Sequence, residues 1–298
     1  MRINRLKFRA DIISFDIIGY ILLILFSIVC ILPFWMIIVG AFTSDQYITA
    51  HGYPLWPVEF STSSFEYILN DASAILRSYG VTIFVTVVGT FFGVLINAMA
   101  AYVLQRKDFK YRNFFSFYFF FTTLFSGGLV PWYILCAKYL NFKDNIHALI
   151  LPGLVSVWNM LIIKGYLGSI PDAVTESAYI DGAGDFRIFL QIILPLSKPV
   201  IATISLFTAL NYWNDWYNSM LFIQNEKLFM LQFYLYKLIG SAQGLKIAAD
   251  KAGIVVENPP IQSTKMAMTI IVIGPIIFLY PFVQKYFVKG ITIGAVKG

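Results

Sequence analysis

Apolar residues occur along this chain in six long runs, and the shorter segments between them carry most of the charged residues. As a helix rising about 1.5 Å per residue, each run is long enough to cross a hydrocarbon core of about 30 Å. The pattern therefore predicts an all-α integral membrane protein that forms one transmembrane domain over residues 1–298. The six predicted membrane helices lie near Ile17–Phe42, Tyr79–Leu104, Phe114–Leu135, Ile146–Ile163, Pro199–Asn218 and Ala267–Phe287.

Composition agrees with this assignment. Of the 298 residues, 58% are hydrophobic and 13% are charged, whereas soluble domains average about 45–50% and about 25%. The net charge of +6 could indicate a nucleic-acid partner, but the charges flank the apolar runs. We therefore interpret them as topology signals and expect no nucleic acid. Cys30 and Cys136 lie in or beside apolar runs, so they predict neither a disulfide nor a metal site.

Basic residues mark one side of the membrane. By the positive-inside rule, short basic flanks lie in the cytoplasm, which places both chain termini there. The first apolar run follows a basic segment, as in a signal peptide, but it is too long for one and lacks a small-residue cleavage site. We expect it to remain as a membrane helix. The basic flanks are Arg2, Arg5, Lys7, Arg9, Arg106, Lys107, Lys110, Arg112, Lys285, Lys289 and Lys297.

Residues 169–199 form a mixed polar and apolar segment on the same cytoplasmic side. Ser169 and Asp172 have the spacing of a capping box, and Pro171 fits the first turn of a helix. Gly182 should end this short helix, because glycine adopts the backbone conformation of a sharp turn. A second helix is expected from about Asp185 to Leu194-Pro195. The segment should therefore form a cytoplasmic elbow.

This elbow resembles the EAA loop of binding-protein-dependent ABC importer permeases. Three matches carry the resemblance: Glu176-Ser177-Ala178, Asp181-Gly182-Ala183 and Ile192-Ile193-Leu194-Pro195. Ser177 departs from the alanine that the family often has, but one small side chain replaces another. The alternative interpretation is an ordinary amphipathic loop between two membrane helices.

The resemblance implies the type I ABC importer permease (MetI-like) fold, with six transmembrane helices and a cytoplasmic coupling helix. It implies that the elbow fits a cleft in a separate ATPase subunit and transmits its motion. The residues expected to make this coupling contact are Glu176, Ser177, Ala178, Tyr179, Ile180, Asp181, Gly182 and Ala183.

The second apolar run carries small residues at four-residue spacing, among them Gly89 and Gly93. Such a stripe allows a second helix to approach closely, so we expect these glycines to pack against a neighbouring helix; a role in the substrate path is the alternative. In the third run, residues 125–131 contain two glycines and a proline, which should bend or unwind the helix. We expect this irregular backbone beside the translocation path.

The fifth run ends in polar and aromatic residues. Thr208, Asn211, Asp215 and Asn218 recur at helical spacing and predict one polar stripe that faces a cavity or a partner. The aromatic residues could stack on sugar rings, or they could form an interfacial aromatic belt. The candidate substrate-path residues are Asn211, Trp213, Asn214, Asp215 and Tyr217.

The last residues, 288–298, resemble the C-terminus of maltose-type sugar permeases. The segments Phe125–Gly128 and Trp213–Trp216 are similar to a branch of that family assigned to complex oligosaccharides. The resemblance implies an importer of a carbohydrate across the bacterial cytoplasmic membrane by alternating access. Its partners would be a second, different permease, an ABC ATPase dimer and an extracytoplasmic solute-binding protein, which the external loop 220–265 could reach; that loop could equally be a folded cap.

The sequence has no phosphate-binding P-loop motif, so ATP and Mg²⁺ are expected in the partner ATPase, and this chain is expected to bind no cofactor. The predicted helices carry no ionisable residue near their centres, which argues against ion coupling. With only His51 and His147, no catalytic constellation is evident and no enzyme activity is expected. Two alternatives remain: an importer of the same fold for another solute, and an ion-coupled transporter or assembly factor.

Overall fold

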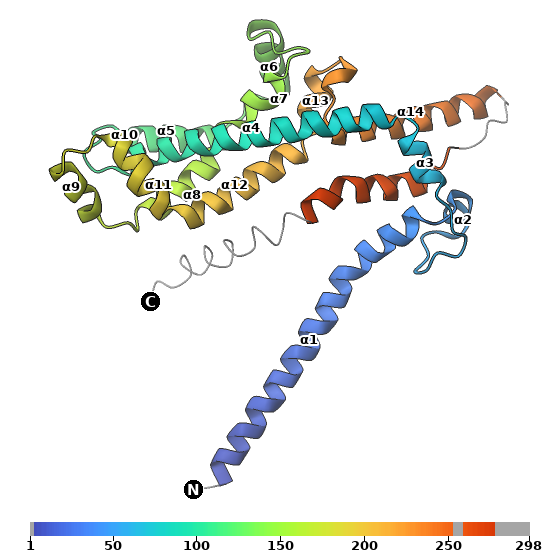
Figure 1. Ribbon diagram of the computed structural model, residues 1–298, viewed down its shortest axis with the longest axis horizontal. Coiled ribbons are helices and arrows are strands. Elements are labelled where there is room, and N and C mark those ends of the chain that lie inside the picture. The colour runs from blue at the N-terminus through green and yellow to red at the C-terminus, as the bar shows by residue number, and fades with distance from the viewer. Residues whose placement is uncertain (1–2, 253–258, 278–298) are drawn as a thin grey trace. The chain divides into compact units, whose positions relative to one another are not determined.

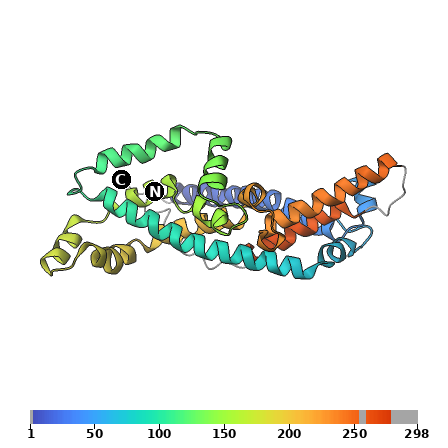
Figure 2. The same cartoon turned by 90° about the horizontal axis from the view of Figure 1, so that it is seen from above.

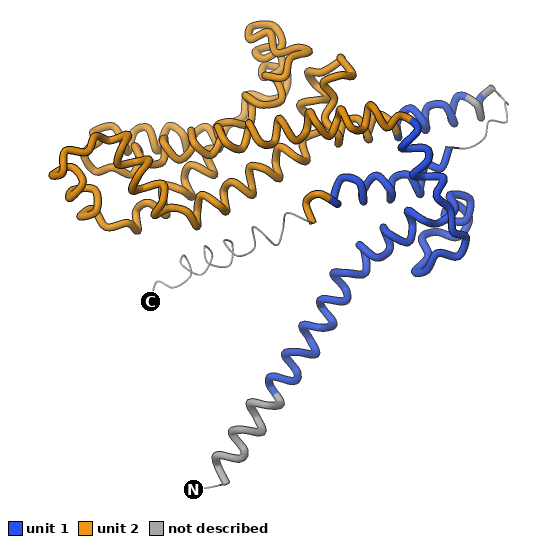
Figure 3. Tube along the Cα trace, viewed as in Figure 1, with its two compact units in different colours: residues 1–70, 239–274 blue, residues 71–238, 275–298 orange. Residues whose placement is uncertain are grey.

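The computed structural model describes residues 3–252 and 259–277. The chain divides into two compact units (Figure 3): unit 1 comprises residues 1–70 and 239–274, and unit 2 comprises residues 71–238 and 275–298. The secondary-structure elements in the described ranges are all helices. Apart from them, one isolated antiparallel β-bridge joins Thr43 to Phe60. The all-α prediction is therefore confirmed for the described residues.

Unit 1 contains the long N-terminal helix α1, Ile3–Ala41, of which Phe15–Ala41 is apolar enough to cross a membrane. Residues 261–274 of the helix over Ile261–Ile277 belong to the same unit. The Asp45 carboxylate accepts hydrogen bonds from the first backbone N–H groups of that helix, so it caps the helix from a distant part of the chain. The short helices of unit 1 are α2, Asp45–His51, and α3, Ser63–Leu69.

Unit 2 is built along α4, Ala72–Gln105. The Asp71 side chain starts this helix by accepting a hydrogen bond from the Ala74 N–H. Helices α8, Val157–Leu167, and α12, Lys198–Trp213, pack along α4 (Figures 1 and 2). One buried apolar cluster joins the C-terminal half of α4 to α8 and α12, and a second joins its N-terminal half to the segments around 148–150 and 222–233.

The remaining elements of unit 2 are short or bent. They are α5, Arg112–Leu124; α6, Leu129–Ile134; the π-helix η1, Leu135–Tyr139; α7, His147–Ile150; the 3-10 helix η2, Leu151–Gly153; α9, Asp172–Ile180; α10, Asp185–Ile188; the π-helix η3, Phe189–Ile193; α11, Leu194–Leu196; α13, Tyr217–Phe222; and the 3-10 helix η4, Glu226–Leu228. Helix α14, Leu231–Ala252, begins in unit 2 and ends in unit 1.

The predicted membrane helices differ from the observed ones in an informative way. Two described helices are individually long and apolar enough to span a membrane, and three pairs of shorter helices meet this test only when combined across a bend. Counting each pair as one span, the described residues hold up to five candidate spans. The predicted span Ala267–Phe287 lies partly outside the described residues. The C-terminal segment 288–298 lies wholly outside them.

The sharpest bend, 113°, separates α5 from Leu129–Tyr139. It falls at Gly127 and Gly128, from which it was predicted, and Gly128 has a positive φ of 85°. The fifth predicted span was drawn too long. Helix α12 ends at Trp213 instead of Asn218, and it follows Asp185–Leu196 at an angle of 85°. The predicted external loop 220–265 contains helix α14, so it is largely helical where described.

Candidate functional site

The segment that the sequence marks as an elbow forms α9 and the turn that follows it. Gly182 has a positive φ of 77°, and its N–H bonds to the Tyr179 carbonyl at 3.0 Å. The Ala183 N–H bonds to the Ala178 carbonyl at 3.0 Å. These two bonds form a Schellman motif, in which glycine takes the left-handed position that ends the helix. The predicted role of Gly182 as the helix terminator is therefore confirmed.

The predicted capping box at the start of α9 is wrong. Helix α9 begins at Asp172, its N-cap residue is Pro171, and no side chain caps it. The Ser169 hydroxyl instead donates to the Tyr166 carbonyl at 2.6 Å, from the turn that follows α8. Ser169 lies in the turn after α8, and Asp172 is already the first residue of α9, so Ser169 is not at the N-cap position that a capping box requires.

Helix α9 is buried on one side only. Ala178 is 7% exposed and joins the apolar cluster that also contains Ala101 and Ile188. Ile180 is 88% exposed, and Phe186, just beyond the turn, is 65% exposed. Exposed apolar side chains this prominent at the tip of a protruding turn are typical of a surface that another protein covers.

The other candidate coupling residues also lie on α9 and its turn. Glu176 is exposed and has no hydrogen-bond or ion-pair partner in the described part of the chain. The Ser177 hydroxyl donates to the Ala173 carbonyl within the helix, so it adds no unpaired polar group to the surface. Asp181 forms the C-cap of α9.

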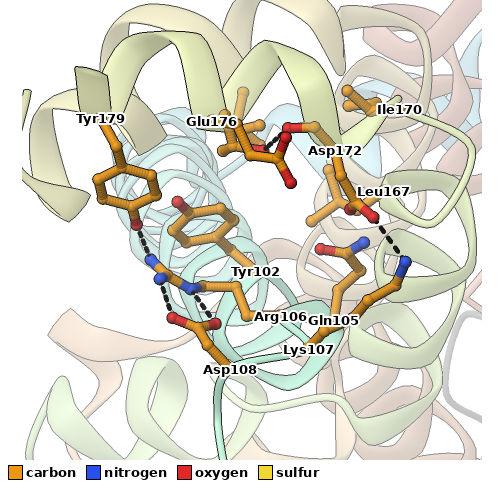
Figure 4. Close-up of a pocket in the computed structure, with 12 residues that line it drawn as sticks. Tyr102, Gln105, Arg106, Lys107, Asp108, Leu167, Ile170, Asp172, Glu176 and Tyr179 are labelled. Atoms are coloured by element: carbon orange, nitrogen blue, oxygen red, sulfur yellow. Dashed lines mark hydrogen bonds and ion pairs between the residues drawn. The ribbon is translucent and has the colours of Figure 1, made fainter. Parts of the chain in front are cut away.

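A pocket with a volume of about 240 Å³ lies between the inner side of α9 and the C-terminal end of α4 (Figure 4). Tyr102 lines it, and its hydroxyl is buried without a hydrogen-bond partner among the described residues. Glu176 and Tyr179 line it from α9. The pocket shows that packing alone does not fill the space between α9 and α4.

Arg106, directly after α4, connects this helix to the elbow. Its Nη1 donates to the hydroxyl of Tyr179 and to Oδ1 of Asp185, the first residue of α10. Its Nε and Nη2 bond to the Asp108 carboxylate. Lys107 makes a second link, from Nζ to Oδ2 of Asp172 at 2.5 Å. Figure 4 shows the bond from Arg106 to Tyr179 at the left and the bond from Lys107 to Asp172 at the right of the residues that line the pocket.

The charges of this cluster reinforce one another. The hydrogen bond from Arg106, together with its positive charge, holds the pKa of Asp108 below its usual value. Partial burial, assisted by the hydrogen bond to Asp185, raises the pKa of Tyr179 to about 12. Tyr179 is therefore a neutral hydroxyl at physiological pH. It accepts from Arg106 and donates to Asp185.

Sequence reasoning missed the residues that hold the elbow. Arg106 and Lys107 were interpreted only as topology signals, and Asp185 only as the start of a helix. Arg106 lies 73 residues from Tyr179 and 79 from Asp185, so no local spacing connects them. The one available signal was the presence of unpaired charges at the ends of two segments assigned to the same side of the membrane.

Gly89 and Gly93 both lie on the buried side of α4. A Cβ atom on Gly89 would be 2.4 Å from the Tyr212 ring, and one on Gly93 would be 3.4 Å from the Leu154 carbonyl oxygen. Asn97, one turn further, donates to the Leu154 carbonyl at 2.8 Å and accepts from the Ser156 N–H at 3.0 Å. This stripe therefore lies at contacts of α4 with α12 and with the segment before α8.

The predicted polar stripe at the end of α12 does not exist as one face, because the helix ends at Trp213. Thr208 is buried and accepts a hydrogen bond from Asn159 at 3.2 Å. Asp215 accepts from the Asn218 N–H at 3.0 Å and thereby caps the short helix α13. Among the candidate path residues, Trp213 is buried, Asp215 is partly buried, and the exposed ones are Asn211, Asn214 and Tyr217.

Apolar helices long enough to span a membrane, together with an anchored and protruding elbow, indicate a helical integral membrane protein. The chain belongs to the family described as binding-protein-dependent transport system inner membrane component, whose pattern matches residues 89–293. The resemblance seen in the elbow is thereby confirmed, and the chain has the helical MetI-like permease fold.

Two relatives from Bacillus subtilis (strain 168) are each 37% identical over 284 residues, which is 95% of this chain. The polygalacturonan/rhamnogalacturonan transport system permease protein YtcP is covered over 98% of its length, and Protein LplC over 95%. A solved bacterial ABC transporter involved in the import of the acidic polysaccharide alginate contains a chain with a TM-score of 0.77 and 29% identity. The match covers 92% of this chain and 96% of that one.

Proposed function

We propose that this chain is a permease subunit of an ATP-driven importer that moves an oligosaccharide across the cytoplasmic membrane of a bacterium by alternating access. Its relatives over nearly the whole chain include a permease named for polygalacturonan and rhamnogalacturonan, and the similar structure belongs to an alginate importer. Both names describe polymers of acidic sugars. An acidic oligosaccharide is therefore the first substrate to test.

The elbow is the proposed contact with the ATPase. The observation that carries this proposal is the exposure of Ile180 at 88%, on a helix whose opposite side is anchored through Ala178. Burial of an isoleucine side chain contributes about 1.5–3 kcal/mol, so an exposed one at a protruding tip favours docking. In this arrangement α9 is the coupling helix, and ATP and Mg²⁺ bind to the partner ATPase and not to this chain.

The orientation of the subunit follows from its charges. With α9 and the Arg106 segment on the cytoplasmic side, the positive-inside rule places both termini there as well. The opposite side then carries α13 and the start of α14. We propose that this external part meets the solute-binding protein, that a second permease completes the pore, and that residues 1–298 act as one transmembrane domain.

A substrate path beside the end of α12 remains our proposal for Asn211, Asn214, Asp215 and Tyr217. Polar groups that remain accessible at this point can bond to sugar hydroxyls, and an exposed tyrosine ring can stack on a sugar face. Trp213 is buried, so in this path it would position neighbouring residues and would not contact the sugar.

Uptake into proteoliposomes tests the proposed function. The chain is reconstituted together with a second permease, an ABC ATPase and a solute-binding protein of the same importer, and the vesicles are loaded with ATP. We expect uptake of radiolabelled oligogalacturonate only with ATP, binding protein and intact elbow. Uptake of maltodextrin or alginate oligosaccharide instead would change the assigned substrate to that sugar. Uptake of a peptide, phosphate or amino acid would contradict the assignment to sugars, and uptake driven without the ATPase would contradict the importer class.

The elbow is tested separately by combining Glu176→Lys with Gly182→Asp. Aspartate at position 182 must adopt the left-handed backbone of the Schellman motif, and lysine at position 176 reverses an exposed charge that lines the pocket. We expect loss of the ATPase subunit on copurification. Glu59→Lys, an exposed charge reversal in unit 1, is the control and should retain the ATPase. Coupled uptake at the unmodified rate in the double variant would refute the role of the elbow.

A further inference from the structure

A single arginine joins three segments at the inner end of α4. Arg106 bonds to Tyr179 on α9, to Asp185 at the start of α10, and to Asp108 in the loop before α5. Figure 4 shows its guanidinium group between Asp108 and Tyr179. The group reaches both sides of the Gly182 turn, since Tyr179 precedes the turn and Asp185 follows it. Arg106 can therefore hold the turn as well as the helix.

The surroundings of Arg106 favour a fixed position for its side chain. The side chain is only 20% exposed, although its carboxylate partners are 64% and 67% exposed. Its guanidinium carbon lies 5.8 Å from the ring centre of Tyr102 and 5.2 Å from that of Tyr179. A planar guanidinium can bond to several acceptors in its plane while it stacks on aromatic rings, and a lysine ammonium group cannot.

The other link between α4 and α9 is weaker by the same criteria. Lys107 and Asp172 are 74% and 47% exposed, so water and salt screen their attraction. Among the described residues, only Arg106 and Lys107 form side-chain hydrogen bonds to α9 from outside the elbow. Lys107→Gln therefore provides a matched control for Arg106→Gln.

Packing does not replace these links. The pocket of about 240 Å³ lies between α9 and α4, and Ala178 is the one buried residue of α9. A short helix held by one small apolar side chain can tilt into such a space. Its orientation then depends on the polar links at its ends.

We propose that Arg106 is a positioning residue that locks α9 to the inner end of α4, so that the two helices move as one body when the ATPase moves. This inference rests on the proposed function of α9 as the coupling helix. Without the guanidinium, the ATPase would tilt α9 into the pocket instead of moving α4. ATPase binding would be retained, but its motion would not reach the membrane helices.

Distance measurements between spin labels test this lock in the full-length chain. The label sites are Val103→Cys on α4 and Ala173→Cys on α9, both exposed, in a background with Cys30→Ser and Cys136→Ala. In lipid nanodiscs we expect one narrow distance distribution without further changes. Because hydrogen bonds to a charged group shift an equilibrium about tenfold, Arg106→Gln should increase the displaced fraction about tenfold. Lys107→Gln should leave the distribution narrow.

The assembled complex provides the readout that a purely structural role would not change. Trapping with ATP and vanadate should leave the distance between the labels constant in the parent complex and change it in Arg106→Gln, with the melting temperature unchanged. Arg106→Lys keeps the positive charge but lacks the planar guanidinium group, so its change in label distance should lie between those of the parent complex and Arg106→Gln. Asp185→Asn should change the label distances in the same way as Arg106→Gln. The double variant should show little further change, because both residues belong to one interaction.

The outcomes separate this inference from the proposed function. A narrow distribution in Arg106→Gln, or a distance in the parent complex that changes on trapping, would overturn the lock. Failure of the ATPase to copurify with the parent chain would overturn the coupling role of α9. In that case a broadened distribution in Arg106→Gln alone would still show that the arginine orients the helix.

Discussion

The ring of Tyr212 occupies the space that Gly89 leaves free. A Cβ atom on Gly89 would lie 2.4 Å from Cζ of the tyrosine, and one on Gly153 would lie 2.7 Å from its hydroxyl oxygen. The same hydroxyl donates to the Ile150 carbonyl at 2.7 Å. Tyr212 is therefore held by a hydrogen bond between two glycine surfaces, and it fixes how α12 approaches α4.

We predict that Gly89→Ala destabilises the protein by about 2 kcal/mol. Alanine ordinarily stabilises a helix relative to glycine, but here its methyl group would overlap a ring that cannot move without breaking its hydrogen bond. Thermal unfolding in nanodiscs measures the change. Gly80→Ala on the same helix is the control, because a Cβ atom there would meet nothing within 4 Å, and it should be neutral or stabilising. Equal melting temperatures for the two variants would show that the contact between Gly89 and Tyr212 leaves room for a methyl group.

This contact also shows how far the sequence could predict the fold. The four-residue spacing of Gly89, Gly93 and Asn97 predicted one closely approached face of a helix, because that spacing is a local property of the chain. It could not identify the neighbour. Tyr212 lies 123 residues further along the sequence than Gly89. The sequence predicted that it belongs to an aromatic belt or stacks on sugar, and its burial became evident only from the structure.

Asn97 should be more important for stability than its neighbours on α4. Its side chain pairs with the Leu154 carbonyl and the Ser156 N–H, where the chain bends by 43° before α8. Asn97→Leu would leave both backbone groups unpaired in an apolar setting, at a cost of about 1–2 kcal/mol. Denaturation in nanodiscs measures this cost. Thr86→Val on the same helix is the control: the Thr86 hydroxyl is buried and has no hydrogen-bond partner among the described residues, so its loss should not destabilise the protein.

Asp45 should stabilise the start of the helix over Ile261–Ile277. Its carboxylate accepts from the N–H groups of Gln262 at 2.6 Å and Ser263 at 3.0 Å. Removal of such a cap costs about 1 kcal/mol, so Asp45→Ala should accelerate hydrogen exchange in the segment 261–265. Asp45→Asn keeps an acceptor and should retain most of the protection. If both variants exchange like the parent chain, the helix does not depend on this cap.

The elbow shows the same division between local and distant information. Gly182 could be predicted because a helix terminator acts within a few residues. The bend within the fourth predicted span and the end of α12 inside the fifth were harder to predict, because mean hydropathy changes little across a break. The Arg106 cluster could not be predicted at all, since it depends on how α4, α9 and α10 meet in space. Long-range ion pairs leave no spacing pattern in a single sequence.

Asp144 should make the loop between η1 and α7 sensitive to acid. This residue lies in the loop between η1 and α7 with a positive φ of 53°, and its Oδ1 accepts from the N–H groups of Gln224 and Asn225. These backbone hydrogen bonds lower its pKa below the usual 3.8. The folded state therefore binds the proton less readily than the unfolded state does, and the carboxylate stabilises the fold above pH 3.8.

We predict that Asp144→Asn lowers the melting temperature at neutral pH, and that this difference shrinks as the pH falls below 3.8. Asparagine tolerates the left-handed backbone and keeps one acceptor, so the variant removes the charge while the turn can still form. Unfolding of both proteins is followed across a pH series in the same nanodiscs. A difference that stays constant from neutral to acidic pH would mean that the carboxylate charge does not stabilise the fold. A difference that grows on acidification would mean that the folded state raises the pKa instead of lowering it.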